Sequence, residues 1–371
     1  MSSFVSHVLV RIMTAFAMVA ACATVAFAIR PRLPKPTGPV PVGTSVIALD
    51  AFTTKGKPIV GCIWYPAEAD RGPYAAYALG ATGLPTRDRL VSALVRTDAR
   101  RNNAVRAGRA PVIIYIPGLG GRRFHNTALA QDLASHGYIV VAVDDTQPSV
   151  GFDFSSEAGI QRTLIEGDRK VRLQARDIAS VLDALAKLDA APSGILSHRL
   201  SLERVGVLGF SFGGAVAAEI ARKDRRVAAA VDLDGSIFGE VRLRGVSKPF
   251  LFMTGRNEIE SVFEATFDRE NIVALVRGLE RSGGYMATVD GMDHNNFSDA
   301  AVLPSLRHTG VGSIDGERGM QIIARNVRFF FDRYIRGETA RRLGGHETAD
   351  AAVSLREFGG ERQVGAGLKV K

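Results

Sequence analysis

Short apolar runs alternate with amphipathic stretches along the chain from residue 44 onward. Pro111 to Ile116 and Tyr138 to Asp144 are almost continuously apolar before they reach Gly- or Asp-containing segments, which is typical of fully buried parallel strands. Asp168 to Leu188 instead repeats apolar residues largely at the spacing of an amphipathic helix. Strands and helices that alternate in this way predict an α/β fold, in which helices cover both faces of a mainly parallel central sheet.

Similar patterns predict the remaining elements. An initial hairpin is expected over Ser45 to Phe52 and Ile59 to Trp64. The other expected strands are Arg204 to Phe210, Val227 to Leu233, Phe250 to Thr254 and Gly284 to Val289, and the other expected helices are Asn126 to His136, Gly213 to Lys223 and Met320 to Ile335. The chain shows no internal repeat and no linker after residue 43. We therefore expect one domain over residues 44–340 and a C-terminal tail over residues 341–371.

The amino terminus has the pattern of a targeting segment. Arg11 precedes an uncharged run from Ile12 to Ile29, which contains the small-x-small sequence Ala26-Phe27-Ala28. This predicts a signal peptide over residues 1–28 and an exported protein, periplasmic or secreted. Two alternatives stay open: an uncleaved membrane anchor, because the run is just long enough to span a bilayer, and a lipoprotein lipidated on Cys22. Five prolines between residues 30 and 43 predict an extended tether over residues 29–43.

Composition narrows the function classes only slightly. The chain has 371 residues, 46% hydrophobic and 23% charged, and two cysteines provide no disulfide framework. A net charge of +9 raises the question of nucleic acid or anionic membranes as partners. The densest basic cluster, Arg96 to Arg101, comes with no helix-turn-helix, zinc spacing or aromatic-basic motif, which argues against nucleic-acid binding. We expect a solvated face or peripheral contact with an anionic membrane.

The motif Gly209-Phe210-Ser211-Phe212-Gly213 has the clearest chemical meaning. A five-residue Gly-x-Ser-x-Gly pattern also occurs by chance in chains rich in Gly and Ser. Here, however, the motif follows an expected strand and opens an expected helix, which is the context of a nucleophile elbow. In such an elbow a strained turn projects the serine hydroxyl, and bulky side chains in place of the glycines would collide with the neighbouring backbone. Ser211 is therefore the candidate nucleophile.

A serine nucleophile needs a general base and an orienting acid. Of seven histidines, His294 alone follows an expected strand late in the chain, on the sheet edge where Ser211 is expected. The acid stays open between Asp234, at the end of the strand after the elbow helix, and Glu258, after the next strand. Asp232 lies inside its strand, two positions before Asp234.

The oxyanion of an acyl-transfer intermediate needs two backbone donors. The N–H of Phe212, directly after the nucleophile, is one candidate, and the N–H of Leu119 in the Gly118-Leu119-Gly120 loop is the other. A Gly-rich loop after a strand is also found in dinucleotide sites, but the third glycine is missing at the required spacing.

The chain resembles a known family, the plasma-type platelet-activating factor acetylhydrolases and their bacterial relatives in the α/β-hydrolase superfamily. The resemblance covers about residues 40 to 340 and rests on five blocks in order: PVIIYIPGLGG, DLASHGYIVVAVDD, GFSFGGAVA, AVDLDG and MDHNNFSD. It implies Ser211 as nucleophile, His294 as base and Asp234 as acid, with Glu258 as the fallback. It also implies that Leu119 and Phe212 supply the oxyanion donors. Pro117 and Phe210 depart from the family pattern, which commonly has histidine at both positions.

The resemblance implies a serine esterase that releases short acyl chains from phospholipids, with no metal or cofactor. An acyltransferase or an esterase for polyesters or xenobiotics would use the same residues. A non-catalytic hydrolase-fold binding protein at the membrane is an alternative of another class. Serine at position 211 argues against dienelactone hydrolase activity, which uses cysteine. The loop from Thr146 to Gly167, with Phe152 and Phe154, is interpreted as a wall or lid over the acyl pocket or as a surface loop.

Overall fold

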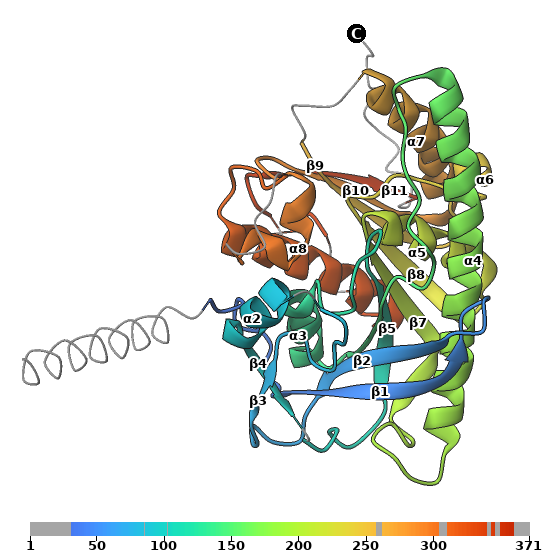
Figure 1. The fold of residues 1–371 in the computed structure, drawn as a ribbon. Helices are drawn as coiled ribbons and strands as arrows, with labels where there is room; N and C mark the ends of the chain where they lie inside the picture. Colours follow the sequence, from blue (N-terminus) through green and yellow to red (C-terminus); the bar gives the residue numbers. More distant parts are fainter. Residues whose placement is uncertain are drawn as a thin grey trace, which may run out of the picture.

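One mixed sheet forms the centre of the fold. The computed structural model describes residues 31–84, 86–101, 103–256, 262–303, 310–339, 343–345 and 349–359. The strands are β1 (Val42–Phe52), β2 (Pro58–Pro66), β3 (Tyr74–Ala76), β4 (Arg96–Arg101), β5 (Ala110–Ile116), β6 (Ile139–Val143), β7 (Leu200–Phe210), β8 (Val227–Leu233), β9 (Phe250–Gly255), β10 (Gly284–Val289) and β11 (Val353–Phe358). They lie in the order β11-β10-β9-β8-β7-β5-β6-β2-β1-β4-β3 (Figure 1).

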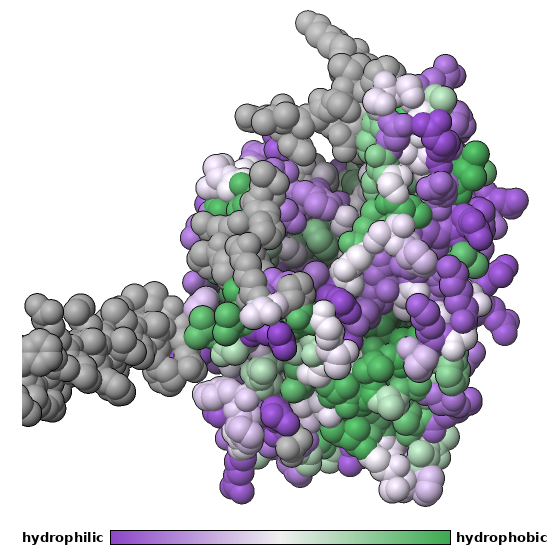
Figure 2. All heavy atoms as spheres, viewed as in Figure 1, coloured by the Kyte–Doolittle hydropathy of each residue, from purple (hydrophilic) through white to green (hydrophobic). Residues whose placement is uncertain are grey.

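Helices cover both faces of this sheet. They are α2 (Thr86–Leu94), α3 (Thr127–Ser135), α4 (Glu157–Ala190), α5 (Phe212–Lys223), α6 (Val241–Arg244), α7 (Val262–Ser282) and α8 (Gly316–Phe331), with short helical turns η1 (His294–Phe297), η2 (Asp299–Ala301) and η3 (Asp332–Arg336). The side chains of α4, α5, α6 and α7 share one apolar cluster, and those of α3 and α8 share the other. Figure 2 shows mainly hydrophilic surface over the outer side of α4, as expected of an amphipathic helix.

The sequence-based prediction of the fold class is confirmed. The consecutive pairs from β6 through β5, β7, β8 and β9 to β10 are all parallel. Every residue of β6 is buried, as its uniformly apolar sequence predicts. Because these strands are parallel, the loops after β5, β7, β8 and β10 emerge at one edge, and these loops carry the candidate site residues.

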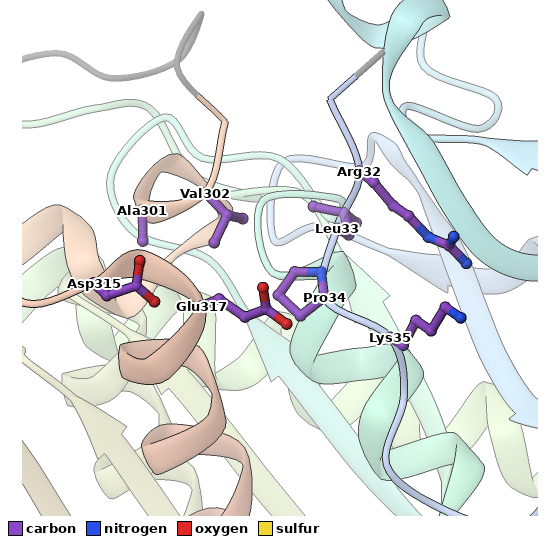
Figure 3. A pocket seen from close by; sticks show the side chains of 9 residues that line it. Arg32, Leu33, Pro34, Lys35, Ala301, Val302, Asp315 and Glu317 are labelled. Carbon is purple, nitrogen blue, oxygen red and sulfur yellow. The ribbon is translucent and has the colours of Figure 1, made fainter. Parts of the chain in front are cut away.

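The N-terminal segment is more ordered than an extended tether. From residue 31 onward it packs along α3, with Leu33 only 1% exposed. The Thr37 N–H donates to Asp132 at 2.7 Å, and the Val40 N–H donates to the Ser135 carbonyl at 3.1 Å. Figure 3 shows this segment facing the start of α8 across a pocket of about 430 Å³. Composition suggested a tether because prolines favour extended backbone, yet that backbone binds the helix.

The expected C-terminal tail contains a strand of the sheet. β11 pairs with β10 in antiparallel register from Val353 to Phe358. Apolar and polar residues alternate from Val353 to Arg356, which suits an edge strand with one exposed face, but so short a pattern does not distinguish a strand from a tail. The expectation of a tail over residues 341–371 is therefore wrong for residues 353–358.

The long loop expected from Thr146 to Gly167 is also partly helical. α4 begins at Glu157 and has 34 residues, and the Ser156 side chain caps it by accepting the Gly159 N–H at 3.1 Å. The start of this helix was not predicted because Gly159 and Gly167 lie in it, and glycine is a poor helix former.

The predicted targeting segment, residues 1–28 with Cys22, lies outside the described residues. Within the residues that are described, no helix is both long enough and apolar enough to cross a membrane.

Candidate active site

Ser211 occupies a strained turn between β7 and α5. Its backbone has φ 55° and ψ −128°, a conformation that costs a non-glycine residue roughly 1–3 kcal/mol. Hydrogen bonds hold the turn in place: the Ser211 N–H donates to the Leu233 carbonyl, and the Gly214 N–H donates to the Ser211 carbonyl, each at 2.8 Å. The turn is therefore fixed by the strand beside it and by the helix that follows.

The two motif glycines allow close backbone contact around this turn. A Cβ on Gly209 would overlap the Gly213 carbonyl, and a Cβ on Gly213 would overlap the Ile116 carbonyl at the end of β5. Larger residues at these positions would push α5 away from the sheet. The structure thus places Ser211 at the tip of a nucleophile elbow, as the motif predicts.

Asp234, His294 and Ser211 form a continuous hydrogen-bonded chain. Asp234 Oδ2 lies 2.8 Å from His294 Nδ1, and His294 Nε2 lies 2.9 Å from Ser211 Oγ. The side chain of His294 is 41% exposed, whereas that of Asp234 is 16% exposed. The imidazole is therefore open to incoming molecules, while its carboxylate partner is largely shielded from water.

Asp234 is held so that one carboxylate oxygen remains for the histidine. Its backbone, at the end of β8, also has φ 55°, and its N–H donates to the Met253 carbonyl at 2.7 Å. Oδ1 accepts hydrogen bonds from the Thr254 hydroxyl at 2.8 Å and from the Gly255 N–H at 2.9 Å. These two donors fix the carboxylate plane and direct Oδ2 toward the imidazole.

The loop that carries His294 is braced by the side chain of Asn296. Its Oδ1 accepts the N–H groups of Asp293 at 2.8 Å and of Gly312 at 2.7 Å. The ring of Phe210, the residue before the nucleophile, lies 4.9 Å from the imidazole between centroids. Phe210, which departs from the resembled family, therefore packs against the candidate base.

The other candidates have different places. Asp232 is fully buried, and its Oδ1 accepts the Gly235 N–H at 2.9 Å. It therefore holds the turn that contains Asp234. Glu258, the fallback acid, lies outside the described residues, as do His308 and His346. Of the two acids left open by the sequence, Asp234 is the one that the structure brings to His294.

The two candidate oxyanion donors belong to segments that lie next to Ser211. Phe212 is the first residue of α5, so its N–H has no carbonyl four residues earlier in the helix to bind. The Leu119 loop runs close to the elbow: a Cβ on Gly118 would lie 3.0 Å from the Ser211 Cβ. An oxyanion formed at Ser211 would therefore arise between this loop and the start of α5.

Aromatic rings gather beside the elbow. The Phe152 ring centroid lies 6.2 Å from that of Phe212 and 5.5 Å from that of Phe238, and Phe152 is 40% exposed. The loop that carries Phe152 is therefore next to the candidate nucleophile, which its interpretation as a wall requires. Sequence reasoning did not find Phe238, because it lies in a loop with no motif.

Two polar residues behind the Leu119 loop were also missed. Asp145 Oδ2 accepts the Gly120 N–H at 2.8 Å, and the Lys170 ammonium lies 2.8 Å from Asp145. The sequence does contain an indication of Lys170. This lysine lies directly beside Val171 on the apolar stripe of an amphipathic helix, where a charged residue is unexpected.

Neither cysteine chemistry nor a metal site is evident in the described residues. Cys62 is buried in β2, and burial raises the pKa of its thiol to about 11. Such a thiol is not a reactive nucleophile. No group of three or more His, Cys, Asp or Glu residues suited to a metal ion occurs in the described ranges.

Comparisons with known proteins match this architecture. The family described as platelet-activating factor acetylhydrolase, isoform II, matches residues 26–158 and 193–339, and the dienelactone hydrolase family matches residues 98–259. The platelet-activating factor acetylhydrolase of Cavia porcellus is 24% identical over 82% of this chain and 78% of its own. A probable 1-alkyl-2-acetylglycerophosphocholine esterase of Arthroderma benhamiae is 24% identical over 63% of each chain.

A solved structure of an esterase gives the same picture. The ferulic acid esterase from Streptomyces cinnamoneus is 26% identical, with a TM-score of 0.67 over 88% of this chain and 99% of its own. These matches establish an α/β-hydrolase fold and a carboxylic ester hydrolase. The family match covers most of the residues that build the sheet and its loops. This chain belongs to the platelet-activating factor acetylhydrolase isoform II family.

Proposed function

We propose that this esterase uses Ser211, His294 and Asp234 as its catalytic triad. The observation that carries the proposal is the hydrogen-bonded chain from Asp234 Oδ2 through both ring nitrogens of His294 to Ser211 Oγ. The strained elbow supports it, because backbone strain of this kind is typical of functional sites.

The geometry supports an acyl-transfer cycle. His294 Nε2 takes the proton of the Ser211 hydroxyl as Oγ attacks the ester carbonyl carbon. The N–H groups of Leu119 and Phe212 bind the developing oxyanion. His294 then donates the proton to the leaving alkoxide, and water, activated by the same imidazole, releases the acyl group. Asp234 keeps the Nδ1–H of His294 directed toward its carboxylate and stabilises the imidazolium.

Replacement of the nucleophile tests the proposal directly. Ser211→Ala is expected to lower kcat on p-nitrophenyl acetate by about 10⁴-fold or more, with an unchanged circular dichroism spectrum. Ser197→Ala is the matched control, because Ser197 lies in the loop before β7, at the end of that strand opposite to Ser211. Turnover by purified Ser211→Ala close to that of the Ser197→Ala control would refute the triad.

We further propose short-acyl glycerophospholipids as the substrate class. Support comes from relatives named platelet-activating factor acetylhydrolase and 1-alkyl-2-acetylglycerophosphocholine esterase. The test is kcat/KM on phosphatidylcholines with sn-2 chains of increasing length, beside p-nitrophenyl esters of the same chains. A preference for short chains on the phospholipid series supports the proposal. Equal efficiency with and without the headgroup argues for a general esterase.

A second candidate substrate class is esters of aromatic acids. The specific observation is the cluster of Phe152, Phe212 and Phe238 beside the nucleophile, and the similar solved structure is a ferulic acid esterase. Methyl ferulate in the same panel tests this class. A kcat/KM for methyl ferulate above that for every short-acyl phospholipid would replace the first proposal.

Export remains a proposal from the sequence of residues 1–28. Mass spectrometry of the protein recovered from fractionated cells tests it. A mature chain that begins after Ala28 supports cleavage, whereas an intact amino terminus in the membrane fraction supports an anchor.

A further inference from the structure

A buried ion pair lies behind the loop of the proposed oxyanion hole. Asp145 follows β6, and Lys170 projects from α4, 25 residues later in the chain. The Lys170 ammonium is 2.8 Å from both carboxylate oxygens of Asp145, and the two side chains are only 3% and 4% exposed. Burying two charges is expensive, and a well-packed apolar pair is often as stable. The burial of the pair is therefore weak evidence that it serves fold stability.

The Asp145 end of the pair holds the loop that contains Leu119. Asp145 Oδ2 accepts the Gly120 N–H at 2.8 Å, and the Asp145 N–H donates to the Gly121 carbonyl at 3.0 Å. Gly120 directly follows Leu119, so these two bonds fix the peptide groups next to the proposed donor. A carboxylate acceptor makes the Gly120 bond stronger than a neutral acceptor would.

The Lys170 end lies close to the residue that carries the second proposed donor. Its ammonium donates to the carbonyls of Gln147 at 2.9 Å and Pro148 at 3.1 Å, and it lies 5.4 Å from the centre of the Phe212 ring. Phe212 carries the other proposed donor. One ammonium group therefore contacts Asp145, which holds the first donor's loop, and the side chain of the second donor.

We propose that Lys170 and Asp145 are positioning residues that set the distance between the two oxyanion donors, Leu119 and Phe212. This inference rests on the proposed function, because it assumes acyl transfer at Ser211. The pair acts through geometry, because its hydrogen bonds fix the loop of Leu119 and the carbonyl groups of Gln147 and Pro148. An error in donor placement weakens binding of the transition state far more than binding of the ester.

Two single variants test the pair. Asp145→Asn and Lys170→Met are each expected to lower kcat on p-nitrophenyl acetate by about 10- to 100-fold, a smaller loss than removal of an oxyanion donor, with KM within about twofold of wild type. The matched control is Asp332→Asn, which removes an equally buried, ion-paired carboxylate from η3, outside the proposed machinery. The control is expected to lose stability but to keep kcat.

A transition-state analogue provides a second measurement. A trifluoromethyl ketone accepts Ser211 Oγ at its carbonyl carbon, and the resulting oxyanion occupies the hole. Its inhibition constant is expected to rise with the loss of kcat in each variant, whereas that of the corresponding alcohol, which forms no adduct, stays within twofold.

If a single variant does not fold, the double variant Lys170→Met with Asp145→Leu removes both charges of the pair together and is measured in the same way. A folded single or double variant with wild-type kcat and wild-type affinity for the ketone would overturn the inference. Retained turnover in Ser211→Ala would instead overturn the proposed function, so the two failures are distinguishable.

Discussion

The two sides of Ser211 are held by different kinds of interaction. On the triad side, hydrogen bonds hold the groups: a hydroxyl and a backbone N–H bind Asp234, and the side chains of Asn296 and Asp293 accept N–H groups within the loop of His294. On the oxyanion side, the loop with Leu119 is tied to a buried ion pair between β6 and α4. Loss of one neutral bond costs about 1 kcal/mol, whereas an unpaired buried charge costs about 3–5 kcal/mol. Loss of one supporting group should therefore cost more free energy on the oxyanion side than on the triad side.

The largest expected effect belongs to the triad side. Asp234→Asn is expected to lower kcat by about 10⁴-fold at neutral pH, because an amide no longer favours the Nδ1–H tautomer or stabilises the imidazolium. The melting temperature should change little, since the shape of the side chain is kept. Steady-state kinetics with calorimetry measure both. A loss below tenfold would show that another acid, such as Glu258, serves His294.

A smaller effect is expected one step further from the chemistry. Thr254→Val removes one of the two hydrogen bonds to Asp234 Oδ1, and the Gly255 N–H remains. Loss of about 1 kcal/mol of support should lower kcat about fivefold. Thr254→Ser keeps the hydroxyl and is expected to match wild type. If Thr254→Val exceeded Asp145→Asn in its effect, the contrast between the two sides would be reversed.

The smallest effect on kcat is expected at Asp299, which links the His294 loop to α3. It accepts the N–H groups of Thr127 at 2.7 Å and Ala128 at 3.1 Å, yet burial raises its pKa to about 7. A carboxyl whose pKa is higher in the folded state than in the unfolded state stabilises the fold below about pH 4. That contribution is lost as the pH rises toward 7.

Calorimetry of Asp299→Asn at pH 5 and pH 8 checks this sign. The variant does not titrate at this position, so its melting temperature relative to wild type should be higher at pH 8 than at pH 5. A constant difference between the two pH values would contradict the raised pKa. Activity at pH 8 should stay within about threefold of wild type, because Asp299 touches neither the triad nor the oxyanion loop.

On the triad side, the residues that the sequence indicated lie together in the structure for a physical reason. Ser211, Asp234 and His294 each follow an apolar strand, and parallel strands bring their carboxyl ends to one edge whatever the rest of the chain does. The choice between Asp234 and Glu258 needed information beyond strand order, because a carboxylate follows each of two strands. The resemblance to a family favoured Asp234, and the structure brings that residue to His294.

On the oxyanion side, the sequence indicated the candidate donors but not the residues that hold them. The glycine loop and the elbow indicated Leu119 and Phe212, but the ion pair behind them depends on how α4 crosses the sheet, which periodicity does not specify. The packed N-terminal segment and β11 were missed for a similar reason. Each is a short segment whose structure comes from its partners, α3 and β10, rather than from its own propensity.

The backbone strain at the elbow has a consequence for the stability of this enzyme. Among the described residues, the non-glycine residues with positive φ are His198, Ser211 and Asp234, so two of the three lie in the proposed triad. Glycine would relax the backbone at both sites, but it would remove the hydroxyl or the carboxylate. Substitutions that make the protein more heat-resistant therefore have to be sought elsewhere, because these two strained positions carry side chains of the proposed triad.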